Sequence, residues 1–124
     1  MYLFIDNSRE KELFLYYYLE ERWQEKKIEG EVDLLLSIDN LLAEINSNIN
    51  EVKGIGVLLG RGRFTATRIA ATVANTLAYT LKIPIIGVSE PNLDDVLKKI
   101  KKAKVGILIS AKYSGEANIG PRTK

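Results

Sequence analysis

The chain has 124 residues, of which 46% are hydrophobic and 27% are charged, the balance of a soluble globular domain. It contains no cysteine and no histidine, which excludes a disulfide framework, a catalytic cysteine, a Ser-His-Asp triad and any metal site built from these residues. The formal net charge of +2 is too small for a dedicated nucleic-acid or membrane-surface binder, so we expect any RNA contact to be local.

The first thirty residues are predicted to form three strands. Residues 2–5 are an apolar run that stops at the turn-forming residues 6–8, so they predict a buried strand followed by a turn. Residues 11–19 are rich in aromatic side chains and predict a second strand, and the charged residues 22–28 predict an edge strand. No Asn-Gly or Asp-Gly pair marks the hairpin between them, and residues 10–27 are also compatible with a helix.

From residue 31 onward the chain alternates between helices and strands. Apolar residues recur every three or four positions from Leu34 to Ile49, which is typical of an amphipathic helix. Further along, uncharged runs predict buried parallel strands, and the segments between them predict helices. These strands are expected at 54–59, 84–88 and 105–109, and the helices at 65–81 and 92–103. We therefore expect an α/β fold with a mixed five- to six-stranded sheet and the element order βββαβαβ.

The chain is expected to form one domain. Residues 1–110 would be a single lobe, and residues 111–124, which have no periodicity, are predicted to be an extended or disordered tail. The N-terminus has no basic stretch followed by a long apolar run, so neither a signal peptide nor a membrane anchor is expected. Together with the absence of thiols, this indicates a cytoplasmic location.

The helix over 65–81 is the most informative element, because residues 69–81 carry no charged side chain. A helix packed on a sheet normally keeps a charged face toward water, so this one is expected to be covered on a second side. Alanines at every fourth position would let another helix approach, and the consecutive leucines 34–36 spread apolar surface around the preceding helix. We predict a helix-mediated protein interface; the alternative is that the alanines pack on the sheet and the threonines face solvent. The predicted interface residues are Leu35, Leu36, Asp39, Leu42, Ala43, Ala66, Ile69, Ala70, Val73, Ala74 and Leu77.

The loop at residues 60–63 joins a predicted strand end to a helix start, where unpaired N–H groups favour an anion. The candidate contacts with a phosphate or carboxylate are Gly60, Arg61, Gly62, Arg63, Thr65 and Arg68. The loop is neither a Walker A motif nor a G-x-G-x-x-G motif, and solvated or partner-paired arginines are the alternative. The lysines at 98, 99, 101, 102 and 104 are expected to form the solvated face of an amphipathic helix.

Residues 60–89, GRGRFTATRIAATVANTLAYTLKIPIIGVS, resemble the TsaB (YeaZ) family in their Phe-Thr-x-x-Arg loop and their Ile-Pro strand. Residues 4–8 are similar to that family's opening strand and turn, and residues 34–45 to its first helix. The matching positions in the loop and strand are Gly60, Gly62, Phe64, Thr65, Arg68, Ile69, Ile83, Pro84, Gly87, Val88 and Ser89. Arg61, Arg63, Ala66 and Thr67 depart from the pattern and make the loop more basic.

The resemblance implies an RNase H-like, actin-like ATPase half-domain, a short form with the N-terminal lobe only. In that family such lobes serve as the non-catalytic partner of the TsaD enzyme, which makes threonylcarbamoyladenosine in tRNA with the help of the TsaE ATPase. The resemblance also implies that the helices at 33–49 and 65–81 join the chain to a TsaD-type subunit or, in its absence, to a second copy. The tRNA would then be reached only through the complex.

The expected function is therefore that of a scaffold subunit without a catalytic residue, metal or cofactor. The enzyme's metal ligands include histidines, and this chain has none. Two alternatives remain open at this point. One is a small nucleotide-binding protein or enzyme that uses Asp6 and the Gly60 loop, and the other is an RNA-binding accessory protein that uses the arginine loop and the lysine-rich helix.

Overall fold

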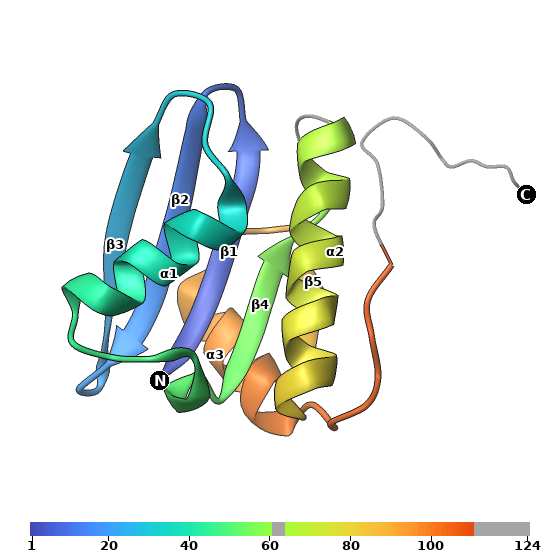
Figure 1. Ribbon diagram of the computed structural model, residues 1–124. Coiled ribbons are helices and arrows are strands. Elements are labelled where there is room, and N and C mark those ends of the chain that lie inside the picture. Colours follow the sequence, from blue (N-terminus) through green and yellow to red (C-terminus); the bar gives the residue numbers. More distant parts are fainter. Residues whose placement is uncertain (61–63, 111–124) are drawn as a thin grey trace, which may run out of the picture.

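The computed structural model describes residues 1–60 and 64–110, and it contains a mixed five-stranded sheet in the order β3-β2-β1-β4-β5 (Figure 1). The first three strands pair antiparallel, whereas β4 pairs parallel with β1 and β5 parallel with β4. The strands are β1 (Tyr2–Arg9), β2 (Glu12–Leu19), β3 (Arg22–Glu29), β4 (Gly54–Leu58) and β5 (Ile85–Val88). The predicted α/β class and the βββαβαβ order are confirmed, and the helical alternative for residues 10–27 is wrong.

Helices cover both faces of the sheet (Figure 1). On one face lie α1 and α2, with α2 packed along β4 and β1, and on the other face α3 packs on β4 and β5. The helices are α1 (Leu34–Glu44), α2 (Phe64–Leu81) and α3 (Leu93–Lys102), with a short 3₁₀ helix η1 (Ile49–Glu51) before β4. The result is a three-layer arrangement in which β4 is buried over its whole length and β1 over residues 3–6.

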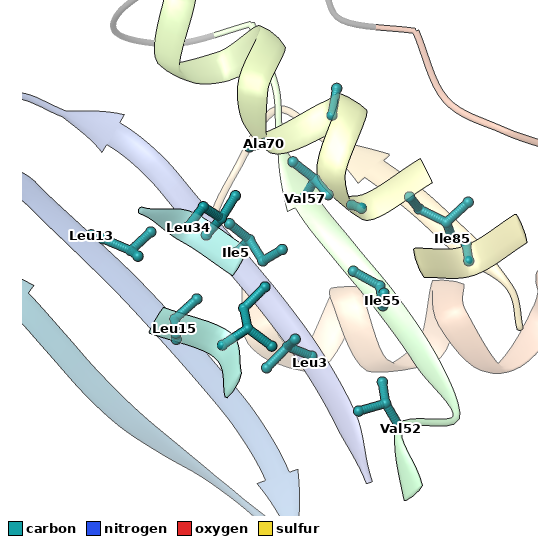
Figure 2. Close-up of a cluster of buried hydrophobic side chains, with 14 of the residues drawn as sticks. Leu3, Ile5, Leu13, Leu15, Leu34, Val52, Ile55, Val57, Ala70 and Ile85 are labelled. Atoms are coloured by element: carbon teal, nitrogen blue, oxygen red, sulfur yellow. The ribbon is translucent and has the colours of Figure 1, made fainter. Parts of the chain in front are cut away.

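Alternation along the strands divides the core into two parts. Odd-numbered residues of β1, such as Leu3 and Ile5, point toward α1 and α2, where they meet Leu13, Leu34 and Val57 (Figure 2). The even-numbered Phe4 of the same strand points to the opposite face. Successive side chains of a strand alternate between faces, so β1 contributes equally to both halves of the core. The second half is small and is made by Phe4, Leu58, Val88, Val96 and Ile100.

The outer strand β3 differs from its neighbours because it is strongly charged. It pairs only with β2, so its other edge is open to solvent. Lys26 forms an ion pair with Glu44 of α1 at 3.2 Å, and Lys27 forms one with Glu12 of β2 at 3.1 Å. The prediction of a charged edge strand is therefore confirmed.

Glycines in β4 allow α3 to lie directly on the sheet. A Cβ atom at Gly56 would lie 3.0 Å from the Phe4 ring and 3.0 Å from Cγ1 of Val96, and one at Gly54 would collide with Cγ2 of Ile100. Both positions are buried within β4, so the space they leave open is taken by α3 side chains.

Replacing Gly54 by alanine is expected to lower the free energy of unfolding by about 1 to 3 kcal/mol, because overpacking must push Ile100 and α3 away from the sheet. Urea denaturation of both proteins measures this loss. In an Ile100→Ala background the same replacement should cost clearly less, since the colliding methyl group is gone. Equal costs in both backgrounds would show that Ile100 is not the obstacle.

Two boundaries of the early elements differ from the predictions. Residues 6–8 were expected as a turn, but β1 continues to Arg9 with a register irregularity after Asp6. There the Asp6 carboxylate accepts hydrogen bonds from the N–H and Oγ of Ser8, so the turn-forming trio makes a bulge within the strand. The first helix ends at Glu44 and not at 49, because Asn46 adopts a left-handed conformation (φ 57°) and the N–H of Ser47 bonds back to the carbonyl of Leu42.

The prediction of a strand at 105–109 is wrong, and the described sheet has no sixth strand. Gly106 has a φ of +97° and bends the run, which leaves Val105 and Ile107 exposed. Ile109 is held instead by the side chain of Asn75 in α2, whose Oδ1 accepts from the Ile109 N–H at 2.9 Å and whose Nδ2 donates to the Ile109 carbonyl at 2.8 Å. An amide side chain thus takes the place of a strand neighbour. The predicted tail at 111–124 lies outside the described residues.

Candidate functional site

Helix α1 begins at a defined cap and turns one side toward the sheet. The carboxylate of Asp33 accepts a hydrogen bond from the N–H of Leu36 at 2.9 Å, and the Asp33 carbonyl accepts from the hydroxyl of Ser37 at 2.8 Å. With this start, Leu34 and Ile38 are buried on the inner side. Leu35 and Leu36 consequently point outward and are 52% and 57% exposed.

Replacing Asp33 by alanine is expected to cost about 1 kcal/mol of unfolding free energy, because the Leu36 N–H loses its acceptor at the helix start. Chemical denaturation followed by far-UV circular dichroism checks this value. Asp33→Asn keeps an acceptor oxygen and should retain most of the stability, so similar losses in the two variants would contradict a capping role.

Helix α2 presents its alanines to the sheet, which corrects part of the predicted interface. Ala66, Ala70 and Ala74 are buried on β1 and β4, and Leu42 of α1 is buried beside them in the same core. The three alanines are not available to a partner, because the close approach that small side chains permit is made to the chain's own sheet. Leu42 is 2% exposed and lines a groove beside α1.

The outer side of α2 combines apolar and polar residues. Ile69 is 47% exposed, and Val73 and Leu77 are half-buried against the core. The exposed positions between them are threonines, so the alternative in which threonines face solvent is correct for those residues. On α1, Asp39 and Ala43 are exposed beside the leucines. We call the outward residues of both helices the helix-pair surface: Leu35, Leu36, Asp39, Ala43, Ile69, Val73 and Leu77.

An open groove of about 630 Å³ runs between α1, η1 and Leu77 of α2. Its walls are mainly aliphatic, and the carboxylates of Asp33 and Asp39 lie at its rim. A second hollow of about 330 Å³ lies on α2 itself and is lined by Thr65, Arg68, Ile69, Thr72 and Val73. The helix pair therefore offers two mainly apolar hollows with polar residues beside them, which is the form of a protein-binding surface.

Sequence reasoning missed three residues that line the groove. Asp33 and Ile38 line it from α1 and Ile49 lines it from η1. Ile49 continues the helical periodicity of α1, and that periodicity was the signal that could have identified it.

The structure describes only part of the predicted anion site. Gly60 follows β4 with a φ of +75°, and Thr65 and Arg68 are exposed on the first turns of α2. Arg68 already interacts with another group of the protein. Arg61, Gly62 and Arg63 lie outside the described residues, so anion binding at this loop stays a prediction.

A small pocket of about 160 Å³ lies between the end of β1 and the start of α2. Asn7, Arg9 and Thr65 line it, and the side-chain amide of Asn7 donates to the carbonyl of Ala66 at 3.1 Å. This hydrogen bond ties the end of β1 to the start of α2. Within residues 1–60 and 64–110, no cluster of acidic side chains could hold a metal ion, and no helix is long and apolar enough to cross a membrane.

Comparisons with known proteins agree with this architecture. Residues 30–114 match a protein family described as TsaD: tRNA N6-adenosine threonylcarbamoyltransferase. Among curated proteins, the chain is 35% identical over 81 residues to the tRNA threonylcarbamoyladenosine biosynthesis protein TsaB of Buchnera aphidicola from Acyrthosiphon pisum, with 64% of this chain and 37% of that protein covered. It is 29% identical over 96 residues to the TsaB protein of Buchnera aphidicola from Schizaphis graminum, with 73% and 46% covered.

Among solved structures, YeaZ from Pseudomonas aeruginosa is similar with a TM-score of 0.64 and 28% identity, and the match covers 72% of this chain and 44% of that one. A protein with similarity to peptidase YeaZ from Pseudomonas aeruginosa gives a TM-score of 0.63 at the same identity, with 72% and 43% covered. The chain thus spans less than half the length of each of these relatives.

Proposed function

We propose, from the premise that this chain belongs to the TsaB/YeaZ family, that it is a non-catalytic scaffold subunit in the threonylcarbamoyladenosine modification of tRNA. In this proposal it binds a TsaD-type subunit through the helix-pair surface. A TsaE-type ATPase and the tRNA then engage the assembled complex. Without the TsaD-type subunit, a second copy of the chain occupies the same surface.

The observation that carries the proposal is the groove between α1 and α2. Two leucines on adjacent positions of α1 are each more than half exposed, although the helix has a fully buried inner side of its own. Ile69 adds a third large exposed aliphatic side chain from α2. A groove of this shape and composition accommodates the apolar side of a partner helix, and the acidic rim of Asp33 and Asp39 favours basic residues at that helix's edges.

The non-catalytic role is supported by what the buried polar groups do. Asp6 is the one buried carboxylate in the described residues, and its Oδ1 accepts hydrogen bonds from the N–H and the hydroxyl of Ser8. Oδ1 of Asp6 therefore stabilises the bulge in β1. No histidine or cysteine exists anywhere in the chain to take over proton transfer or nucleophilic attack.

Co-purification tests the proposal directly. The tagged chain is mixed with the TsaD-type protein of the same organism and examined by size-exclusion chromatography with light scattering. We expect a stoichiometric complex, and modification activity that depends on this chain. No complex, together with full modification activity of the TsaD-type protein alone, would refute the scaffold role.

Titration calorimetry of the chain with adenine nucleotides separates this role from that of a nucleotide-binding enzyme. A scaffold subunit should give no saturable heat with ATP or ADP at micromolar to millimolar concentration. Saturable micromolar binding by the isolated chain would favour the enzyme.

A further inference from the structure

Lysines without an ion-pair partner lie where β4 and β5 begin, at the edge of the sheet that is formed by the starts of these strands. Lys53 immediately precedes β4, and Lys82 follows α2 shortly before β5. The end of α3 reaches the same edge, because Val96 lies on Gly56 and Ile100 on Gly54, so that α3 runs antiparallel to β4. The ends of α2 and α3 lie together at this edge (Figure 1). We call the group the lysine patch: Lys53, Lys82, Lys98, Lys101, Lys102 and Lys104.

No carboxylate in the described parts of the chain forms an ion pair with these lysines, and all of them are exposed. Three of the four described lysines outside the patch are paired, namely Lys26 with Glu44, Lys27 with Glu12 and Lys99 with Asp95, whereas Lys11 is not. The chain has 16 acidic residues against 18 basic ones, so it contains enough carboxylates to pair with most of its basic side chains. The lack of ion-pair partners at this edge leaves an uncompensated positive surface.

The acidic residue just before Lys53 does not neutralise the patch. Glu51 accepts hydrogen bonds from the Ser47 hydroxyl at 2.6 Å and from the Asn48 N–H at 3.3 Å. The bond from Ser47 lowers the pKa of Glu51, and the backbone bond from Asn48 adds to this. The positive charges of the N-terminus and of Lys53 lower this pKa by smaller amounts, but Glu51 forms no ion pair with Lys53 in the described parts of the chain.

Helix capping explains only part of the patch. Lysines in the last turn of a helix interact favourably with its dipole, which accounts for Lys101 and Lys102. Lys53 and Lys104 lie outside any helix and gain nothing from this effect. These positive charges repel one another in the isolated protein, which raises its free energy. A polyanion that binds there is attracted to the same charges, so the electrostatic interaction becomes favourable.

The chemistry of the patch fits RNA better than a membrane or another protein. Val96 and Ile100, on the apolar side of α3, are buried on the sheet, so the helix has no free apolar side to insert into a bilayer. Protein interfaces are depleted of lysine at their centre, whereas phosphate backbones are neutralised by lysines spread over an extended surface. The lysines of α3 also lie away from the helix-pair surface, because α3 covers the opposite face of the sheet from α1 (Figure 1).

We propose that the lysine patch contacts the phosphate backbone of RNA, and that in the role proposed above this RNA is the tRNA held by the complex. The inference rests on the proposed function for the identity of the RNA. A subunit bound at α1 and α2 leaves the lysines of α3 free on the opposite face of the sheet, so both surfaces can be occupied at once.

The test uses the full chain and its complex with a TsaD-type subunit. Binding of an unmodified tRNA transcript is measured at several sodium chloride concentrations for the wild type, for Lys98→Gln/Lys101→Gln/Lys102→Gln, and for the control Lys11→Gln/Lys26→Gln/Lys27→Gln. Both variants lose the same charge, but the control lysines lie in the β1–β2 turn and in β3. Because each phosphate contact contributes roughly one unit to the slope of log K against log salt, the patch variant should lose about three units and the control less than one.

Each possible result supports or overturns the proposed contact between the lysine patch and RNA. Equal slopes for the patch variant and the control would overturn the proposal. Patch-dependent binding to anionic phosphatidylserine vesicles without binding to tRNA would overturn it in favour of a membrane surface. If the complex forms and the slopes do not change, only this inference fails. If no complex forms, the proposed function fails and the slopes of the isolated chain still decide on the patch.

Discussion

Replacing Leu35 and Leu36 by glutamate is expected to weaken binding to a TsaD-type subunit by roughly 100-fold or more, because two aliphatic contacts are lost and two charges enter the groove. Both side chains are more than half exposed in the free chain, so the fold should persist. Light scattering of the mixed proteins measures the complex, and near-UV circular dichroism confirms that the variant is folded. The same variant should also be monomeric when alone.

A matched control exists on another part of the surface. Ile107 and Leu108 are also consecutive, aliphatic and exposed, at 64% and 48%, but they lie outside the helix-pair surface. Ile107→Glu/Leu108→Glu should bind the partner as the wild type does. If this control loses binding and the helix variant keeps it, the partner uses the segment after α3 and the assignment of the helix-pair surface is wrong.

Replacing Phe4 by alanine is expected to remove about 3 to 5 kcal/mol of unfolding free energy, because the cavity would open at the centre of the smaller core half. Phe4 is 0% exposed, contacts the β4 and α3 side chains of that half and lies 5.9 Å from the ring of Tyr16, centroid to centroid. Few other residues fill this space, so the surroundings offer little to collapse into it. The loss is a large part of the typical stability of a domain, about 5 to 15 kcal/mol.

Urea or thermal denaturation measures this loss. Tyr79→Ala removes an aromatic ring of similar size that is 75% exposed on α2, and it should change stability by no more than about 0.5 kcal/mol. A loss below about 1 kcal/mol in Phe4→Ala would mean that α3 is not held by the packing described above.

Most elements could be predicted from the sequence because their patterns are local. The uncharged runs of β4 and β5 identify parallel strands, and the periodicity of α1 identifies a half-buried helix. The run at 105–109 has the same composition as β4 and yet is not a strand. Its conformation depends on the positive φ of Gly106 and on Asn75, a residue distant in sequence whose side chain hydrogen-bonds to the backbone of Ile109.

The candidate site was predictable in its location and only partly in its residues. A helix without charged residues is expected to be covered on two sides. The sequence does not tell which of these sides packs on the sheet. The alanines at 66, 70 and 74 are compatible with a partner helix or with the chain's own strands, and the structure places them on the strands. Leu35, Leu36 and Ile69 could be identified because large aliphatic residues exceed what one inner side of a helix can bury.

The charged border formed by β3 restricts how copies of this protein can meet. The strand β3 carries several lysines and glutamates. Another strand that hydrogen-bonded to it would bring like charges together or separate Lys26 or Lys27 from its glutamate partner, so such pairing is unfavourable. Fibril-like stacking from that border is therefore opposed at every step. In the proposed function, association uses the helix-pair surface instead, and a two-fold pair formed there would close after two subunits and not propagate.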